Sequence, residues 1–600
     1  MEPETHSTGS GQAKNCQNCK QDFVIEPDDF AFYEKIKVPA PTFCPECRLI
    51  RRLAWRNEKS LYKNECKKCD KSIITVYPKS SGIAVYCRPC WWADNWDELE
   101  TGLDFDEHKN FFSELNNLFR KAPVPSLFGA YATLFNSEYT NMVNNLKNCY
   151  LLTHSSYDED CMYGSVIENS KNSVDNTMLT DGELCYENVD CQKCYQSMYS
   201  VDCENCHNIY FSKNCVGCSD CFGCANLRNK RYHIFNQPYS KEEYEARLKE
   251  FNINSYKNVK GLKEKTLDFW QQFPQKYMHD RHNASVSGDY IYNSKNTHHS
   301  FITYDAEDLK FCAFITAGTK TADSYDFTHF GAASELLYES LQVGTNASSM
   351  KFCFFTILDT NNLEYCISSI GCKNCFGCVG LKKKEYCIFN KQYSKEEYFA
   401  LREKIVAHMN ANPYVDKQKN IYKYGEFYPI ELSPFGYNAT TAQEFFSLTK
   451  DEAVAKGYGW QEKEEKSYKI DVSSENLPDT IDDVGEEILS KVIGCEHKGL
   501  CNENCSMAFK ILPEELKFYK RVNIPLPRLC SNCRHHQRNK FVNPMKLWHR
   551  QCMCDGSTSS PQAKTHPQHS GKCPNEFETS YSPDRQEIIY CEQCYQAEVA

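Results

Sequence analysis

Pairs of cysteines three residues apart are the feature that most restricts how this chain can fold. The chain has 36 cysteines among 600 residues, and four such pairs lie within its first 90 residues. The opening residues, MEPETHSTGSGQAKN, lack the apolar core of a signal peptide, so we expect a cytoplasmic protein. Disulfides rarely persist in a reducing cytosol, where paired cysteines are more often metal ligands or redox centres. The pairs therefore predict metal-stabilised modules.

The two ends of the chain carry the same cysteine-rich module. A shift of 486 residues places Cys44 on Cys530 and Cys47 on Cys533, and beyond an insertion that follows Cys554 the shift becomes 504. Two Cys-x-x-Cys pairs can surround one tetrahedral zinc ion, which supplies folding energy that so small a core lacks. The predicted ligands of about four zinc ions are Cys16, Cys19, Cys44, Cys47, Cys66, Cys69, Cys87, Cys90, Cys501, Cys505, Cys530, Cys533, Cys552, Cys573, Cys591 and Cys594.

Two ligand choices at the C-terminal end stay open. The first pair there has the longer spacing Cys501-x-x-x-Cys505, and Cys495 is left over as a spare. Either Cys552 or Cys554 could supply one ligand of the last site. The spacing alone does not choose between them.

The segment CQNCKQDFVIEPDDFAFYEKIKVPAPTFCPECRLIRR resembles the "probable zinc-ribbon" domain of bacterial proteins. The CFGC…YCIFNKQYSKEEY and PLPRLC..CR segments extend the likeness over nearly the full length, to uncharacterised cysteine-rich proteins of candidate-phyla-radiation bacteria. The resemblance implies zinc binding and a treble-clef-like module whose second cysteine pair opens a helix. It implies no established activity. The insertion after Cys554 and the longer Cys501–Cys505 pair depart from the family pattern.

Basic residues follow the second cysteine pair of each module. Residues 48–71 contain nine Lys or Arg against three acids, and residues 528–550 contain six and no acid. One hypothesis is a phosphate-binding face. The interpretation we favour is that these cations offset the charge of the neighbouring zinc thiolates. The candidate nucleic-acid-binding residues are Arg48, Arg51, Arg52, Arg534 and Arg538.

Cysteines recur at intervals of 12 in the middle of the chain, as at Cys191, Cys203 and Cys215. A fixed short period predicts stacked, near-identical units. We therefore expect a β-solenoid over residues 146–236, with a coil of 12 residues or of about two such units. Residues 283–392 are rich in strand-forming runs and predict a second portion.

A repeated motif ends each solenoid portion. CFGCANLRNKRYHIFNQPYSKEEY (221–244) and CFGCVGLKKKEYCIFNKQYSKEEY (375–398) are identical at 16 of 24 positions, but His233 in the first corresponds to Cys387 in the second. Imidazole and thiolate both bind zinc, which would raise the total to six ions. The alternative is packing of small side chains inside a tight coil. The candidate ligands are Cys218, Cys221, Cys224 and His233, and Cys372, Cys375, Cys378 and Cys387.

The predicted fold is multidomain and mainly β, with a central β-solenoid-like region, helical caps and a two-part zinc-ribbon or treble-clef module at each end. Capping boxes at Ser240 and Ser394 predict the helices that follow the two motifs. The expected segments are a tail (1–14), an N-terminal double zinc module (15–98), a helical linker (99–145), solenoid portions (146–236 and 283–392), a helical segment (237–282), a capping helix (393–412), a connector (413–485) and a C-terminal double zinc module (486–600).

We find no catalytic motif, and four-thiolate zinc sites are of the closed, structural kind. The sequence therefore predicts a non-catalytic zinc-binding scaffold or recognition protein with a protein or RNA partner. It indicates neither a membrane span nor a small-molecule substrate. Nucleic-acid binding through the basic helices after Cys47 and Cys533 is an alternative, weakened by the net charge of −11. A thiol redox or metal-handling protein is a second alternative.

Overall fold

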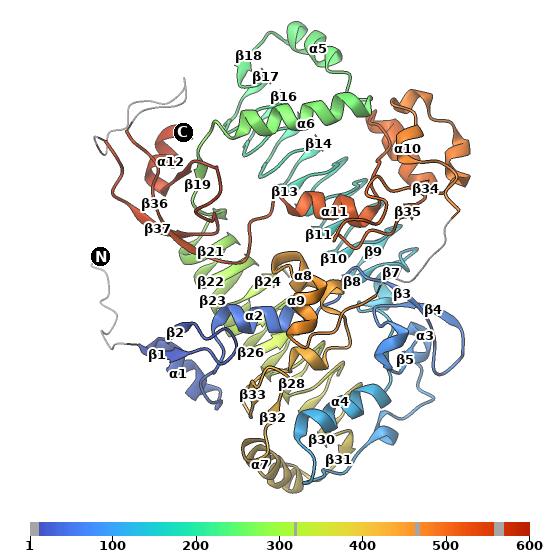
Figure 1. Cartoon of the computed structure of the whole chain (residues 1–600), viewed down its shortest axis with the longest axis vertical. Helices are drawn as coiled ribbons and strands as arrows, with labels where there is room; N and C mark the ends of the chain where they lie inside the picture. The colour runs from blue at the N-terminus through green and yellow to red at the C-terminus, as the bar shows by residue number, and fades with distance from the viewer. Residues whose placement is uncertain (1–10, 317–320, 463–468, 557–568, 570, 600) are drawn as a thin grey trace. The chain divides into compact units, whose positions relative to one another are not determined.

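A computed structural model describes residues 11–316, 321–462, 469–556, 569 and 571–599. The fold is mainly β, with parallel solenoid strands in the middle of the sequence and cysteine clusters near both ends, which confirms the predicted fold class. The chain divides into two compact units (Figure 1). Unit 1 comprises Met1–Ser126 and His279–Gln461, and unit 2 comprises Leu127–Met278 and Glu462–Ala600. Each unit therefore combines one solenoid portion with the terminal module from the opposite end of the sequence.

The solenoid of unit 2 has a coil of 12 residues. Thr153, Ser165, Thr177 and Val189 occupy equivalent places in successive parallel strands. This register settles the coil length that the cysteine spacing left open. The strands are β7 (Leu134–Phe135), β8 (Asn141–Asn144), β9 (Leu146–Lys147), β10 (Thr153–Ser156), β11 (Ser165–Glu168), β12 (Thr177–Thr180), β13 (Val189–Gln192), β14 (Tyr195–Met198), β15 (His207–Tyr210), β16 (Ser219–Phe222) and β17 (Arg231–Ile234).

Each coil of unit 2 has four corners. From Asn145 to Phe235, every third residue has a left-handed backbone. Asn and Asp, which tolerate this conformation better than other side chains, occupy many of the corners. The residue after a corner points into the coil, as Cys149 and Leu152 do, and is buried. The narrow interior therefore selects a small or slender side chain at every third position.

An asparagine closes the solenoid of unit 2. The chain turns back after β17 into the antiparallel β18 (Gln237–Pro238), and the Asn236 amide exchanges two hydrogen bonds with the Ala225 backbone, of 2.9 and 3.0 Å. This side chain thus makes the hydrogen bonds that the backbone of a further coil would make. The predicted capping box of Ser240 and Glu243 follows and starts α5 (Lys241–Glu250). Helix α6 (Tyr256–Trp270) packs on the outer face of the same solenoid (Figure 1).

The solenoid of unit 1 repeats this design less regularly. Its register is 11 residues from Asp280 to Ile291, changes to 12 within the next strand pair, and is 15 from Ala306 to Thr321. It is then 13 over three coils, as from Ala322 to Glu335, and 12 over the last two. Asn390 closes it with hydrogen bonds to Val379, as Asn236 does in unit 2. The strands are β20 (Asp280–Arg281), β21 (Ala284–Tyr292), β22 (Lys295–Tyr304), β23 (Ala306–Lys310), β24 (Ala313–Ile315), β25 (Thr321–Thr328), β26 (Glu335–Leu341), β27 (Ser348–Lys351), β28 (Asn361–Glu364), β29 (Lys373–Phe376), β30 (Glu385–Ile388) and β31 (Lys391–Gln392).

The predicted capping box at Ser394 begins α7, whose Tyr398 is buried against β30. In the N-terminal module, α2 packs on β25 and β26 of the solenoid. The other elements of unit 1 are β1 (Gln12–Asn15), β2 (Asp22–Ile25), α1 (Pro27–Lys35), α2 (Pro45–Leu53), β3 (Tyr62–Glu65), β4 (Ser72–Thr75), β5 (Val85–Tyr86), α3 (Arg88–Trp91), α4 (Phe111–Lys121), β6 (Val124–Pro125), α7 (Lys395–Ala411), β32 (Tyr414–Val415), β33 (Ile421–Tyr422), α8 (Thr441–Phe445) and α9 (Lys450–Ala455).

The C-terminal module of unit 2 packs on its solenoid in the same way as the N-terminal module of unit 1. Its helix α11 packs on the solenoid strand β12. Phe518 and Tyr519 of α10 join the buried cluster that contains Tyr186 and Tyr199 of the solenoid. The elements are β19 (Gln275–Lys276), β34 (Ile493–Gly494), β35 (Ala508–Phe509), α10 (Pro513–Val522), α11 (Ser531–Asn539), β36 (Trp548–Gln551), β37 (Glu576–Thr579), β38 (Ile589–Tyr590) and α12 (Glu592–Val599).

Two segments differ from the boundaries that the sequence suggests. The expected helical linker 99–145 contains α4, but its last residues already form β8, which pairs with the solenoid strand β10. The expected connector 413–485 is shared between the two units, because unit 1 ends at Gln461. Within the described part of the chain, no helix has the length and apolarity needed to cross a membrane.

Candidate metal centres

Four groups of four cysteines bring their sulfur atoms together near the ends of the chain. Within each group the sulfur atoms lie within 4.8 Å of one another. Unit 1 contains two groups and unit 2 contains two. The groups are Cys16, Cys19, Cys44 and Cys47; Cys66, Cys69, Cys87 and Cys90; Cys495, Cys505, Cys530 and Cys533; and Cys552, Cys573, Cys591 and Cys594.

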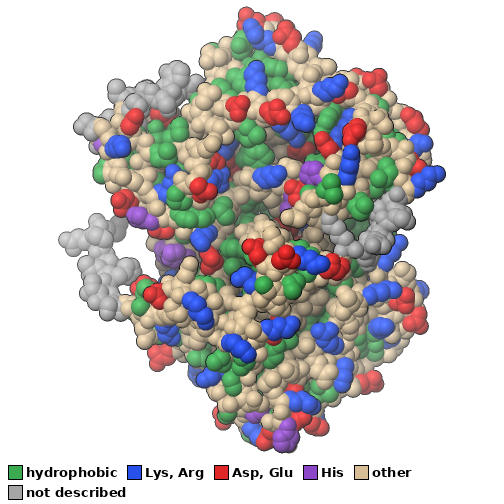
Figure 2. Space-filling view, viewed as in Figure 1, with side chains coloured by type: hydrophobic (Ala, Val, Ile, Leu, Met, Phe, Trp, Pro, Cys, Tyr) green, Lys and Arg blue, Asp and Glu red, His purple; other side chains and the backbone are tan. Residues whose placement is uncertain are grey.

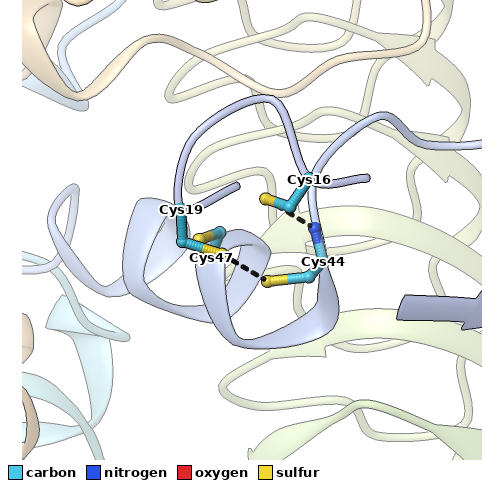
Figure 3. Close-up of side chains that lie close together, drawn as sticks. All are labelled: Cys16, Cys19, Cys44 and Cys47. Atoms are coloured by element: carbon cyan, nitrogen blue, oxygen red, sulfur yellow. Dashed lines mark hydrogen bonds between the residues drawn. The ribbon is translucent and has the colours of Figure 1, made fainter. Parts of the chain in front are cut away.

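The sulfur spacing fits a tetrahedral metal site. The Cys19 and Cys44 sulfurs are 3.7 Å apart (Figure 3). Those of the equivalent pair Cys505 and Cys530 are 4.0 Å apart. The corresponding distances in the other two groups are 3.8 and 3.9 Å. Zinc–sulfur bonds of about 2.3 Å in a tetrahedron place two sulfurs about 3.8 Å apart, whereas a disulfide needs about 2.05 Å. These groups can therefore hold a metal ion, and they do not have the geometry of disulfides.

All four groups share one backbone hydrogen bond. The amide of the third cysteine donates to the sulfur of the first, as Cys44 N does to Cys16 Sγ at 3.2 Å (Figure 3). A helix begins directly after that third cysteine in each group. Amide donors stabilise a thiolate, and they orient it for a metal. The equivalent bonds are Cys87 N to Cys66 Sγ at 3.3 Å, Cys530 N to Cys495 Sγ at 3.3 Å and Cys591 N to Cys552 Sγ at 3.2 Å.

The third group differs from the sequence prediction. Cys495, which the sequence analysis treats as a spare, occupies the place of Cys16, and Cys501 lies beside the group with its sulfur 3.7 Å from that of Cys533. The reason is the hairpin of β34 and β35, because Cys495 directly follows β34 as Cys16 follows β1. An apolar strand ending in cysteine was the sequence signal that could have identified it.

The structure also places the alternatives of the fourth group. Cys552 lies with Cys573, Cys591 and Cys594, and it accepts the shared hydrogen bond from the amide of Cys591. Cys554 is buried nearby, and its carbonyl accepts a hydrogen bond from the amide of Cys573 at 2.9 Å. Cys552 is thus the equivalent of Cys66 in the N-terminal module.

The first cysteine of the groups in unit 1 has a lowered pKa. Hydrogen bonds from the thiols of Cys44 and Cys47 lower the pKa of Cys16 well below its usual value. Burial opposes ionisation of Cys66, but backbone amides, that of Cys87 first, bring its pKa down to about 7. Because metals bind the thiolate, the first cysteine of each site favours the ligand form of sulfur. In the same groups, hydrogen bonding to Cys16 raises the pKa of Cys44 to about 12, and burial raises that of Cys90 to about 12.

In unit 1, arginines of α2 anchor the first cysteine module to the solenoid. Arg48 Nη2 and Arg52 Nη1 lie 2.9 and 3.0 Å from the two carboxylate oxygens of Asp326, a corner residue of the solenoid. Arg52 Nε also donates to Thr328 Oγ1 at 3.0 Å. Arg51 pairs with carboxylates of Glu339 and Glu426. All three arginines are at most 1% exposed.

Unit 2 contains the same anchor. Arg534 Nε and Arg538 Nη1 lie 2.7 and 2.9 Å from the carboxylate oxygens of Asp175, which is also a corner residue. Arg538 Nε donates to Thr177 Oγ1 at 3.3 Å, which matches the contact of Arg52 with Thr328. Two helices that start at a cysteine thus dock in the same way, each on its own solenoid.

The burial of these arginines argues against the hypothesis of an exposed phosphate-binding face. Arg48, Arg51, Arg52, Arg534 and Arg538 all lie inside their units, facing carboxylates. The favoured interpretation, that they offset thiolate charge, is also incomplete. These arginines form ion pairs with carboxylates inside their units. On the face of unit 1 that Figure 2 shows, basic and acidic side chains are interspersed. No sequence signal pointed to Asp326 or Asp175 as their partners.

The solenoid cysteines lie in a different environment. The thiol of Cys203 donates to the carbonyl of Val201 at 3.3 Å, and that of Cys149 donates to the carbonyl of Lys147 at 3.4 Å. Serine makes the same contact, as Ser170 does to Glu168 at 3.1 Å. Burial raises the pKa of Cys149, Cys312 and Cys353 to about 12 each. These side chains serve as small hydrogen-bond donors of the coil interior, as the packing interpretation predicts.

The exchange of His233 for Cys387 has a structural explanation. Each occupies an inward position in the last coil of its solenoid, in register with Cys221 or Cys375. His233 Nδ1 lies 2.7 Å from the carbonyl of Arg231, and Cys387 Sγ lies 3.6 Å from that of Glu385. Both side chains thus donate to the carbonyl two residues earlier.

The other candidate ligands of these motifs have similar partners. Each thiol lies 3.3–3.5 Å from the carbonyl two residues before it, which supports packing, while metal binding there stays a prediction. These thiols belong to Cys218, Cys221, Cys224, Cys372, Cys375 and Cys378.

Comparisons with known proteins indicate no function for this chain, so the candidate metal centres are the main guide to its function. No protein-family model matches the chain, and no curated protein matches it. One similar solved structure is described as a "putative acetyltransferase from Desulfovibrio desulfuricans G20". It is 8% identical, with 49% of this chain and 79% of that chain covered and a TM-score of 0.09. A likeness at that level carries no argument about fold or activity.

Proposed function

We propose that this protein is a non-catalytic scaffold in which four structural zinc ions hold the terminal modules in their folded form. The observation that carries the proposal is the set of four cysteine groups with tetrahedral sulfur spacing and one shared amide-to-sulfur hydrogen bond. Four thiolates leave no open coordination position, and a catalytic zinc needs one.

Zinc is the metal proposed for these sites. Four sulfur ligands in a tetrahedron suit zinc or an iron–sulfur centre. The first and third groups each come from a short hairpin and the start of a helix, as structural zinc modules do. A mononuclear zinc ion is therefore the simplest occupant, and a colourless protein without iron is its signature.

The role of the metal follows from what the adjoining helix does. Helix α2 has nine residues, too few to be stable alone, and it begins at the ligand Cys44. The ion fixes the start of the helix, and the helix then presents Arg48 and Arg52 to Asp326. We infer that metal binding and docking of the module on the solenoid are energetically coupled.

The partner is proposed to be a protein or an RNA, recognised by surfaces that the rigid units present. Exposed aromatic side chains on the solenoid of unit 2 support this, because Phe135 is 67% exposed and Tyr157 is 58% exposed. Such rings stack on bases or fill pockets of a partner protein. The many unpaired thiols favour a reducing compartment, and we propose the cytoplasm.

The test is a metal count on the full chain, purified under reducing conditions. We expect elemental analysis and native mass spectrometry to find at least four zinc ions per chain and no iron. A matched sample treated exhaustively with a chelator should lose these ions together with the fold of the terminal modules. A chain that keeps its full hydrogen-exchange protection without any metal contradicts the proposal.

A further inference from the structure

The third cysteine group carries a loop that its N-terminal counterpart lacks. Two residues separate Cys16 from Cys19, whereas nine separate Cys495 from Cys505. The longer loop folds back on itself through left-handed residues at Lys498, Gly499 and Asn504. This path brings three further donor side chains up to the group, His497, Cys501 and Glu503.

These three residues and Cys533 form a second set of donors. All four ligand atoms lie within 4.8 Å of one another. The sulfurs of Cys501 and Cys533 are 3.7 Å apart, and His497 Nδ1 lies 3.2 Å from Glu503 Oε2. In a tetrahedral zinc site, two sulfurs are separated by about 3.8 Å and a nitrogen and an oxygen by about 3.4 Å. These two of the six donor–donor distances are therefore close to those in a tetrahedral zinc site, and the other four lie within 4.8 Å.

The polar atoms of this set face each other without a hydrogen bond. His497 Nδ1 and Glu503 Oε2 are buried atoms, and neither has a hydrogen-bond partner among the described residues. Burying a ring nitrogen and a carboxylate oxygen in this way is costly unless something satisfies both. A cation between them does so, because each atom then donates its lone pair to the metal.

We propose that His497, Cys501, Glu503 and Cys533 bind a second zinc ion, with the Cys533 sulfur bridging the two metals. The inference rests on the proposed function, because Cys533 must already be a ligand of the four-cysteine group. Five thiolates and one carboxylate around two zinc ions leave the same formal charge as a single four-thiolate site. Before the second ion binds, the Glu503 carboxylate adds one negative charge to that site, so binding of the ion with loss of the Cys501 proton makes the module less negative by one charge.

The second ion exchanges more readily than the ion of the neighbouring four-cysteine group. The side chains of His497 and Glu503 are 28% and 19% exposed, while all four cysteines of the neighbouring group are buried. The loop tip is also open to solvent, with Leu500 89% exposed. A competing chelator reaches these donors before it reaches the four buried thiolates beside them, so the second ion leaves before the ion of that group.

Native mass spectrometry of the full-length, reduced and zinc-loaded protein tests this site. We expect five zinc ions in the wild type and four in His497→Ala and in Glu503→Gln. The control Asn502→Ala changes a residue of the same loop that is outside the donor set, and it keeps five. Titration of the wild type with a chelator should release one ion that His497→Ala lacks, before hydrogen exchange shows that the neighbouring four-cysteine group has opened.

Three results overturn the inference. Four ions in the wild type and in every variant mean that His497 and Glu503 are an ordinary pair, and the proposed function stands. Four ions in the wild type and three in Cys501→Ser mean that Cys501 is a ligand of the four-cysteine group, which also leaves the proposed function intact. A folded wild type without metal contradicts both proposals.

Discussion

The cysteines of the terminal modules and those of the solenoid share a three-residue spacing but use sulfur in opposite ways. In the modules the sulfur atom accepts a hydrogen bond, as Cys16 Sγ does from the amide of Cys44 at 3.2 Å. In the solenoid sulfur mainly donates, as Cys203 Sγ does to the carbonyl of Val201 at 3.3 Å, although Cys218 Sγ also accepts a hydrogen bond from the amide of Lys230 at 3.5 Å. An acceptor sulfur is stabilised as a thiolate and ready for a metal, whereas a donor sulfur must keep its proton. Spacing alone therefore does not identify a metal site.

The residues around the cysteines explain the difference. A module pair sits in the turn of a hairpin or at the start of a helix, where free amides point at sulfur. A solenoid pair sits on two sides of one coil, where a carbonyl lies close to each thiol. The local backbone thus decides whether sulfur meets a donor or an acceptor.

The largest expected effect comes from breaking a module site. We expect Cys47→Ser to lose one zinc ion per chain and to unfold residues 11–53, because structural zinc contributes of order 10 kcal/mol to such a module. Native mass spectrometry gives the metal count, and hydrogen exchange of α2 reports the unfolding. The matched variant Cys191→Ser in the solenoid should keep every ion. Equal metal counts in the two variants contradict the comparison.

The next largest effect is expected at the anchors. The variant Asp326→Ala removes the carboxylate that pairs with Arg48 and Arg52, and both arginines stay buried. We expect this to lower the free energy of unfolding by about 3–5 kcal/mol. Hydrogen exchange of α2 should rise accordingly, while the zinc count stays unchanged. Asp175→Ala is the equivalent variant for α11 in unit 2.

A surface pair provides the control for the anchors. Lys147 and Glu159 form an ion pair in which the lysine side chain is 56% exposed. Pairs of this kind contribute about 0–1 kcal/mol, so Glu159→Ala should barely change the exchange of the solenoid amides. An equally small effect of Asp326→Ala would mean that the module does not depend on its anchor.

The smallest effect is expected inside the coil. Serine already occupies inward positions at Ser170, Ser200 and Ser212. Cys203→Ser keeps the hydrogen bond to Val201 and should cost less than about 1.5 kcal/mol, whereas Cys203→Leu overpacks the coil and should cost about 1–3 kcal/mol. Urea titration followed by solenoid hydrogen exchange measures both. Loss of a metal ion from Cys203→Ser would show that this thiol is a ligand.

The sequence predicted the features that depend on nearby residues. The capping boxes at Ser240 and Ser394 form as expected. The repeat of 12 gave the solenoid and one of its two proposed coil lengths, and the paired cysteines located the metal groups. These predictions were correct because the spacing of residues within a short segment determines the geometry of each feature.

Features that join distant segments could not be predicted in the same way. Arg48 and Asp326 are separated by 278 positions, and nothing local in either segment identifies the other. The basic residues after Cys47 therefore suggested a surface, although the solenoid buries them. Cys495 was missed because the nine-residue loop hides its equivalence to Cys16.

Differential alkylation before and after chelation tests the central claim most directly. Peptide mass spectrometry can assign each labelled thiol in the reduced, folded protein. We expect the 16 cysteines of the four groups to become reactive only when metal is removed, while the 18 cysteines between Cys149 and Cys387 stay protected throughout. Group cysteines that react fully before chelation, in a folded chain, or solenoid cysteines that become reactive together with them, would contradict the account.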